Sequence, residues 1–174
     1  MTHPGIHPAR VQALREGLPR AGRYVLYWMQ ASCRAECNHA LEYAVQRANE
    51  LRQPVLACFG LTPAFPEANA RHYTFLLEGL RDARRGLARR GIPLVVRLGA
   101  PDEVASELAR EASLVVTDRG YLRVQREWRA RATRSIAAPL VQVESDVVVP
   151  VEAASHREED SGATLRPKIP GRLP

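Results

Sequence analysis

The side chains that say most about a possible ligand lie in one turn, Met29-Gln30-Ala31-Ser32-Cys33. This turn follows the first predicted strand of the segment 23–61. The turn contains no glycine. A dinucleotide-binding fingerprint needs glycines there so that backbone N–H groups can approach a pyrophosphate, and a P-loop needs Gly-Lys-Ser/Thr. The residues therefore exclude the two commonest phosphate-binding turns and favour a flat, mostly apolar ligand.

The cysteines offer a second possible chemistry, because Cys33 and Cys37 are four residues apart and His39 follows closely. A closed zinc site needs about four ligands, and no second Cys/His pair follows at ligand spacing. An iron–sulfur cluster would need a further cysteine nearby. We interpret the cysteines as reduced packing thiols. The alternative is a Cys33 thiol whose pKa is lowered at a helix N-terminus.

Catalytic side chains are not evident in this sequence. It shows no Ser/His/Asp pattern and no paired carboxylates, and His39, His72 and His156 are expected at the surface. We therefore predict no catalytic residue and no metal site.

The hydrophobic pattern predicts alternating strands and helices that would position the Met29–Cys33 turn. Helical faces recur within 37–51, 73–87 and 104–112, and short apolar segments occur at 55–59, 94–98, 114–116 and 140–143. Strands that are apolar on both faces are typical of buried parallel sheets. We expect Asn69 or Glu67 to begin the second helix, Gly91 to end it and Pro101-Asp102 to begin the third. The predicted fold is an α/β domain with a five-stranded, doubly wound parallel sheet and right-handed crossovers.

Such a sheet binds ligands beyond the carboxyl ends of its strands, where the strand order reverses. With the first and fourth predicted strands adjacent, the turn 29–33 would face the end of the fourth strand. The predicted cofactor-binding residues are Met29, Gln30, Ala31, Ser32, Cys33, Thr117, Asp118 and Arg119, with Phe59, Gly60 and Leu61 closing one side. The alternative is that Asp118 caps the following helix and that Met29 belongs to the core.

A basic helix follows this site and carries Arg119, Arg123, Arg126, Arg129, Arg131 and Arg134. The chain has 25 Lys+Arg against 19 Asp+Glu, a formal net charge of +6, and Lys168 is its one lysine. One interpretation is a solvated arginine surface; the other is contact of Arg123, Arg126 and Arg129 with nucleic-acid phosphates. Helical spacing predicts that Tyr121, Val124, Trp128 and Ala132 form the buried stripe.

Three segments are expected along the chain. They are an N-terminal extension at 1–22, with a short helix over Ala9–Glu16, an α/β domain at 23–151 and a polar, linker-like tail at 152–174. No apolar run approaches the roughly 18 residues of a membrane span. The N-terminus lacks the apolar stretch of a secretory signal. We therefore expect a cytoplasmic protein.

Several stretches together resemble the N-terminal domain of class II cyclobutane pyrimidine dimer (CPD) photolyases. They are VLYWMQASCRAECNHAL at 25–41, CFGLTPAFPEANARHYTFLLEGL at 58–80, VVTDRGYLRVQREW at 115–128, VESDVVVPVEAAS at 143–155 and TLRPK at 164–168. They occur in the family's order and cover about 23–168. The run Ala31-Ser32-Cys33 departs from the charged and polar run usual at this position, so we expect only modest affinity for an antenna.

The resemblance implies a Rossmann-like α/β domain that holds a light-harvesting antenna chromophore, typically a deazaflavin. It also implies that FAD, the electron-transfer tryptophans and most of the DNA-lesion surface belong to a helical domain that we expect to be missing here and to act as a partner. A fragment, a split gene product or a decayed gene would each account for this. We expect no light-driven DNA repair from this chain alone. The alternative function is a stand-alone α/β module that binds a nucleotide or nucleic acid and has lost repair.

Overall fold

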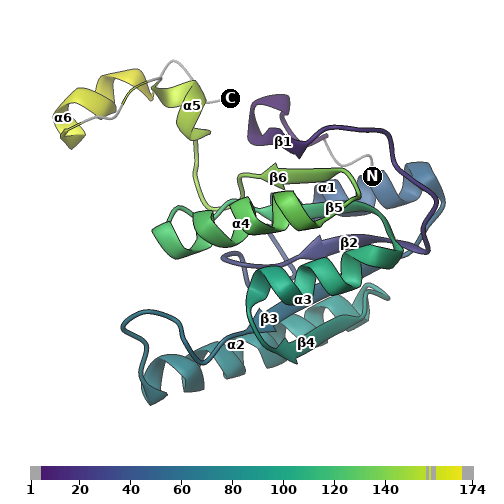
Figure 1. Ribbon diagram of the computed structural model, residues 1–174. Helices are drawn as coiled ribbons and strands as arrows, with labels where there is room; N and C mark the ends of the chain where they lie inside the picture. Colours follow the sequence, from purple (N-terminus) through teal and green to yellow (C-terminus); the bar gives the residue numbers. More distant parts are fainter. Residues whose placement is uncertain (1–4, 156, 158–159, 170–174) are drawn as a thin grey trace.

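A computed structural model describes residues 5–155, 157 and 160–169 and shows a twisted sheet covered by helices on both faces (Figure 1). The strand order is β1-β6-β5-β2-β3-β4. The first of these pairs is antiparallel, and the four pairs from β6 to β4 are parallel. The strands are β1 Val11–Arg15, β2 Tyr24–Trp28, β3 Val55–Leu61, β4 Leu94–Leu98, β5 Ala112–Asp118 and β6 Leu140–Val143.

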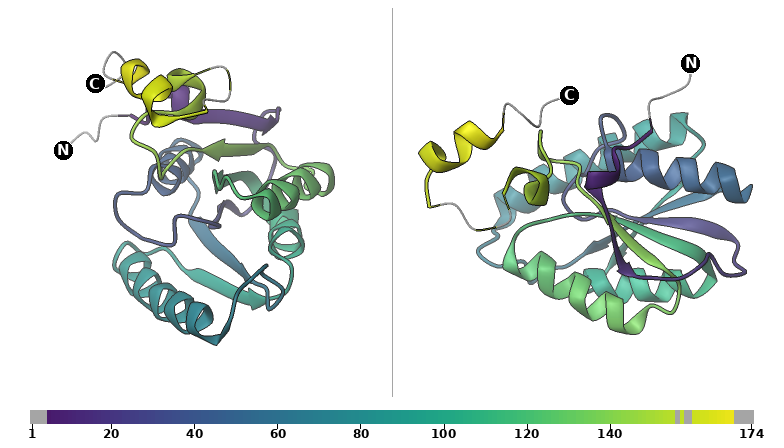
Figure 2. Two further views of the ribbon diagram at one scale, coloured as in Figure 1. Left: turned by 90° about the vertical axis from the view of Figure 1, so that its left-hand side faces the viewer. Right: turned by 90° about the horizontal axis from the view of Figure 1, so that it is seen from above.

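Four main helices cover the sheet: α1 His39–Leu51, α2 Ala70–Arg89, α3 Pro101–Leu108 and α4 Arg123–Ser135. The first two lie on one face and the other two on the opposite face (Figure 2). Alternation along β2 explains how one strand serves both layers, because Val25 and Tyr27 join the core under α1 while Leu26 and Trp28 join the core under α3 and α4. Two short helices, α5 Val151–Ala154 and α6 Gly162–Leu165, follow the sheet.

The predicted helix boundaries agree with the structure. Asn69 caps α2, and its side chain accepts hydrogen bonds from the backbone N–H groups of Arg71 and His72. The helix α3 begins at Pro101, whose fixed φ suits the first helical turn. Gly91 follows the C-terminus of α2 with a φ of +70°, which favours glycine.

The α/β fold class is confirmed, and the sheet has six strands where five were expected. The additional strand is β1, so the predicted helix over Ala9–Glu16 is wrong. The free edge of β6 pairs with this segment, with Val11 opposite Val143 and Ala13 opposite Val141. Backbone pairing outweighs a local sequence of good helix formers.

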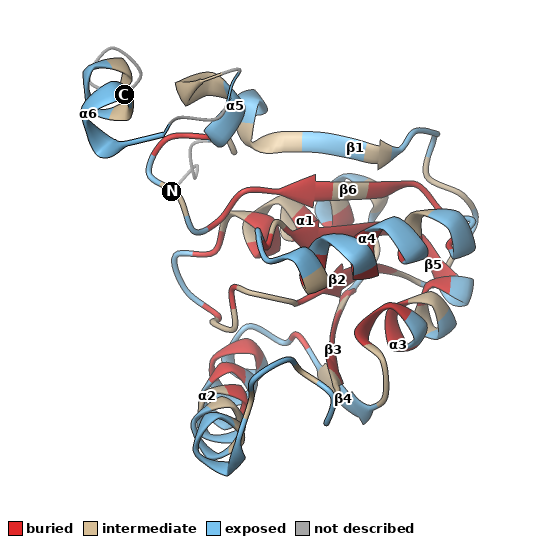
Figure 3. Ribbon diagram, turned by 60° about the vertical axis from the view of Figure 1, so that its left-hand side comes forward, coloured by how far each residue is buried: buried red, intermediate tan, exposed pale blue. Residues whose placement is uncertain are grey.

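The strand β4 also differs from expectation, because it is not buried on both faces. It forms the edge of the sheet opposite β1 (Figure 3). Its Val96 and Leu98 side chains are exposed. Tyr121, which was expected in the buried stripe of the basic helix, is 42% exposed because α4 begins two residues later, at Arg123. Trp128 and Ala132 are buried, as predicted. In the described part of the chain, no helix combines the length and the apolar character needed to cross a membrane.

Replacement of either of two glycines in α2 by alanine tests how closely the turn before α1 packs against this helix. A Cβ atom at Gly86 would lie 2.6 Å from the Ala35 Cβ atom, whereas one at Gly79 would meet nothing within 4 Å. We expect Gly79→Ala to raise the free energy of unfolding by up to about 1 kcal/mol through helix propensity. Gly86→Ala should lower it by about 1–3 kcal/mol through overpacking. Urea unfolding of both variants measures the difference in their free energies of unfolding. Equal stabilisation by the two substitutions would contradict the close contact between Gly86 and Ala35.

Candidate functional site

A cavity of about 340 Å³ lies beyond the carboxyl ends of β2 and β3. Its walls come from the turn after β2, the end of β3, the loop 62–69, the first turns of α2, the start of α3 and one side of α4. Most of its lining side chains are apolar or aromatic, and the ring centroids of Phe65 and Trp128 lie 6.0 Å apart in a tilted arrangement. A cavity of this size and character suits a small, largely apolar ligand.

The structure brings six of the predicted cofactor-binding residues to this cavity: Met29, Gln30, Ala31, Cys33, Phe59 and Gly60. It places the other five predicted residues, Ser32, Leu61, Thr117, Asp118 and Arg119, outside the lining. The lining also includes nine residues that were not predicted: Thr62, Phe65, Ala68, His72, Tyr73, Leu76, Pro101, Gln125 and Trp128. The expected position beyond the strand ends is therefore right, and the expected wall from β5 is replaced by α2 and its preceding loop.

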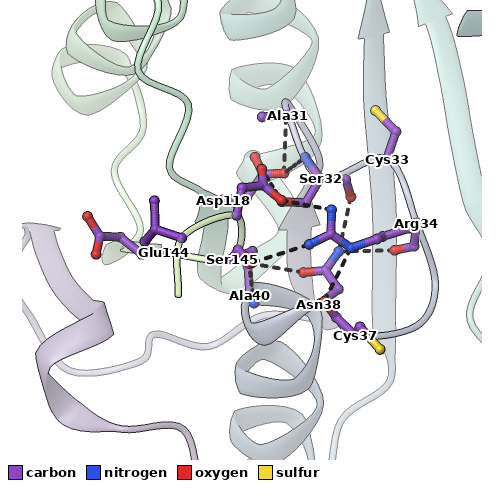
Figure 4. Close-up of polar contacts among 12 residues, drawn as sticks. Ala31, Ser32, Cys33, Arg34, Cys37, Asn38, Ala40, Asp118, Glu144 and Ser145 are labelled. Carbon is purple, nitrogen blue, oxygen red and sulfur yellow. Dashed lines mark hydrogen bonds and ion pairs between the residues drawn. The ribbon is translucent and has the colours of Figure 1, made fainter. Parts of the chain in front are cut away.

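Asp118 supports the cavity from behind. Its carboxylate accepts hydrogen bonds from the backbone N–H groups of Gln30 at 2.9 Å, Ala31 at 3.1 Å and Ser32 at 2.5 Å (Figure 4). It neither lines the cavity nor caps α4, whose N-cap residue is Leu122. The N–H groups that a phosphate-binding turn would offer to a ligand are thus used by a carboxylate of the chain itself. The structure adds a second reason why this turn does not bind phosphate.

Other polar contacts hold the remainder of the turn. The Ser32 hydroxyl donates to Asp146 at 2.9 Å, and the Arg34 guanidinium pairs with the same carboxylate at 2.7 Å. The Asn38 amide donates to the Tyr27 hydroxyl at 2.8 Å and to two backbone carbonyls of the turn, while its oxygen caps α1. These contacts fix the backbone of one cavity wall without any glycine.

Burial controls the titration of the groups near this turn. It raises the pKa of Asp118 to about 6, although the three backbone hydrogen bonds lower it. It also raises the pKa of the Cys33 thiol to about 12. The alternative of a lowered Cys33 pKa is therefore wrong, because α1 begins at His39 and Cys33 does not lie at its N-terminus.

All three cysteines are free thiols. Within residues 5–155, 157 and 160–169, no group of three or more His, Cys, Asp or Glu side chains is placed to hold a metal ion. His39 is partly buried and His72 is exposed and belongs to the cap of α2, whereas His156 lies outside the described residues.

The raised pKa of Asp118 predicts a pH dependence of stability. Because its folded-state pKa of about 6 exceeds the ordinary value of 3.8, the folded chain binds more protons than the unfolded chain between these limits. Stability from this group is therefore greatest below about pH 4 and falls by roughly 3 kcal/mol as the pH rises to about 6. Urea unfolding of the wild type and Asp118→Asn from pH 4 to 8 isolates this contribution. Parallel pH profiles for the two proteins would contradict it.

The predicted basic surface is smaller than the sequence suggested. Arg129 is only 6% exposed, and its guanidinium donates to the Gln30 side-chain oxygen at 3.2 Å and the Gly120 carbonyl at 2.7 Å. The prediction that Arg129 contacts nucleic-acid phosphates is therefore wrong, because its side chain lies inside the fold. Arg123 and Arg126 are exposed, and their contact with phosphates stays a prediction.

Ion pairs neutralise other arginines of this region. Arg119 pairs with Glu144 and Glu152, and Arg123 pairs with Glu127. Arg131 makes a two-pronged contact with Asp102, at 2.6 and 3.0 Å. The helix therefore does not present a continuous row of free positive charge.

The sheet order defines an open α/β domain, and its cavity lies beyond the strand ends, where sheets of this class commonly bind ligands. A family model described as DNA photolyase matches residues 25–172. The chain belongs to the DNA photolyase family.

Two relatives and two solved structures place the chain within this family and fold. The deoxyribodipyrimidine photo-lyase of Methanothermobacter thermautotrophicus is 52% identical over 169 residues, which cover 97% of this chain and 38% of that protein. The enzyme of the same name from Potorous tridactylus is 33% identical over 153 residues, which cover 86% of this chain and 29% of that protein. The chain thus spans well under half the length of these relatives.

The solved structures show the fold alone. An archaeal photolyase from Sulfolobus tokodaii aligns with a TM-score of 0.69 at 15% identity, over 83% of this chain and 34% of that one. That photolyase is described with two FAD molecules and with the implication of a novel light-harvesting cofactor. A universal stress protein aligns over 73% of this chain and all of its own, with a TM-score of 0.51 and 18% identity.

Proposed function

We propose that this chain is the antenna-binding domain of a class II CPD photolyase and that its cavity holds a deazaflavin. The observation that carries the proposal is the apolar, aromatic cavity of about 340 Å³ beyond β2 and β3. The family membership and the stretches that resemble class II enzymes support it. The S. tokodaii photolyase, described with two FAD molecules, supports a flat ring system as the class of ligand.

The cavity fits a flat chromophore in shape and polarity. Met29, Phe59 and Trp128 supply buried apolar surface against which the faces of a fused ring can pack. The Gln30 side chain supplies polarity at one edge. Its oxygen accepts from Arg129, and its buried amide nitrogen has no partner among the described residues. A buried donor without a partner indicates a missing acceptor, such as a ring carbonyl.

The function of such a domain is to absorb light and to pass the excitation energy to a second cofactor. A deazaflavin supplies the absorption when it is bound. This chain's residues bind the ring, exclude water from it and hold it rigidly through the Asp118-supported turn. We assign FAD and dimer splitting to the part of the longer relatives that this chain does not span.

This division of roles predicts that the chain alone does not repair DNA. Splitting a cyclobutane dimer needs an electron donor held near the lesion, and we assign that donor, FAD, to the part of the longer relatives that this chain does not span. Illumination of dimer-containing oligonucleotides with the chain, FAD and a deazaflavin should give no photoreversal above a no-protein control. The purified chain should also carry no stoichiometric FAD in its absorption spectrum. Photoreversal above the control would contradict the proposed role.

A further inference from the structure

A second cavity, of about 480 Å³, lies on the other side of α4 from the 340 Å³ cavity that we propose holds the deazaflavin, named the chromophore cavity below. It is bounded by β1 and β6, by the loop between β5 and α4, and by α5, and Figure 1 shows these elements grouped at one edge of the sheet. The two cavities share no lining residue. The second cavity also differs in chemistry, because three arginines line it and none lines the first cavity.

Three guanidinium groups, those of Arg119, Arg126 and Arg129, line this second cavity. The two carboxylates nearby, Glu144 and Glu152, are both paired with Arg119. Among the described residues, Arg126 has no carboxylate partner, and Arg129 bonds to uncharged oxygens only. Arg126 is therefore the lining arginine whose charge no carboxylate contact offsets among the described residues.

The arginines are close enough to influence one another. Burial lowers the pKa of Arg129 to about 10, and the charges of Arg119 and Arg126 act in the same direction, against the opposite effect of Asp118. A guanidinium group without a carboxylate partner, such as that of Arg126, favours binding of an anion, and its geometry matches phosphate oxygens.

The floor of the cavity carries a pair of amides. The Gln142 amide, on β6, donates to the Gln12 side-chain oxygen, on β1, at 2.6 Å. Gln142 is 5% exposed, whereas Gln12 is exposed. The amide N–H donors of Gln12 and the side-chain oxygen of Gln142, which accepts no hydrogen bond from the described residues, remain for a ligand. A donor beside an acceptor matches the edge of a nucleobase.

We propose that this second cavity binds a nucleoside monophosphate, with the phosphate on Arg126 and the base edge on the Gln12–Gln142 pair. This site goes beyond the proposed antenna function and does not depend on it. A small ligand fits better than a DNA duplex, because Gln142 is only 5% exposed and the edge of a paired base inside a duplex cannot enter the cavity to reach it.

The test uses the full 174-residue chain with adenosine 5′-monophosphate and, separately, inorganic phosphate. Amide chemical shifts by NMR should move around Gly120 and Thr133 on titration with the nucleotide. Arg126→Gln should weaken binding of both ligands about tenfold, because one charge-assisted contact is lost. Gln12→Ala should weaken nucleotide binding several-fold and leave inorganic phosphate binding unchanged.

Arg134→Gln is the matched control. Arg134 is an exposed arginine of the same helix that does not line the cavity, so its replacement gives the same net charge as Arg126→Gln. It should leave both affinities unchanged. Equal weakening by Arg126→Gln and Arg134→Gln would reduce the effect to general charge and overturn the site. Binding of duplex DNA without any shift from the nucleotide would overturn it too.

Discussion

Replacement of Asp118 by alanine is expected to lower the free energy of unfolding by at least about 3 kcal/mol at pH 7.5. The change removes the acceptor of three backbone N–H groups, and each buried donor left without a partner costs about 1–3 kcal/mol. The carboxylate is completely buried, so solvent does not replace it without rearrangement of the turn. Urea unfolding followed by circular dichroism measures the effect.

Asp82→Ala is the control for this variant. Asp82 lies on α2 with its side chain 78% exposed, and its contact with Arg85 at 3.6 Å is a surface ion pair of little worth. The control should change stability by less than about 1 kcal/mol. If Asp118→Ala is as stable as Asp82→Ala, Asp118 does not hold the turn.

Ala68→Trp should weaken binding of a deazaflavin by at least about a hundredfold, or about 2.7 kcal/mol. Ala68 lines the chromophore cavity, and an indole group there would occupy space that a fused ring needs in a volume of about 340 Å³. The measurement is a fluorescence titration of each variant with the deazaflavin.

Ala64→Trp is the matched control, since Ala64 is an exposed residue of the same loop that does not line the cavity. It should bind the deazaflavin as the wild type does. Both variants should unfold within about 1 kcal/mol of the wild type, because each adds bulk in a loop. Equal affinities of the two variants would place the ligand elsewhere.

The central parallel strands could be predicted from sequence because their apolar residues are continuous and turn residues bound them. The edges of the sheet could not. β1 has a local sequence that suits a helix, and it becomes a strand only because β6 offers an unpaired edge. β4 is as apolar as a central strand, although Val96 and Leu98 face solvent. Local pattern does not reveal the position of a strand within a sheet.

The residues of the candidate site that directly follow a strand could be predicted from sequence. The residues that reach the site through the packing of α2 and α4 could not. The turn 29–33 follows directly from the rule that ligands lie beyond the strand ends. Tyr73 and Leu76 belong to the apolar helical face predicted within 73–87, and the N-terminal turns of α2 place both residues in the lining of the cavity. One apolar face of a helix can thus pack against the core along part of its length and line a cavity along the rest.

Charge was the least predictable feature. The arginines around α4 look alike in sequence, yet Arg129 is buried against Gln30 and Gly120 while Arg123 is almost fully exposed. Some partners come from other elements: Gln30 accepts from Arg129, and Glu144 and Glu152 pair with Arg119. The sequence gives the number of charged side chains, and only the fold shows which of them lack an ion-pair partner.

The most direct test of the antenna assignment is an absorption and fluorescence titration of the wild-type chain with a deazaflavin. The structure predicts saturable binding of one molecule per chain, with a red-shifted or quenched spectrum because the ring enters an apolar, aromatic cavity. The modest affinity expected from the Ala31-Ser32-Cys33 run should still give saturation at micromolar to submillimolar concentrations. A linear, unsaturable response with an unchanged spectrum would contradict the assignment of this cavity to a light-harvesting chromophore.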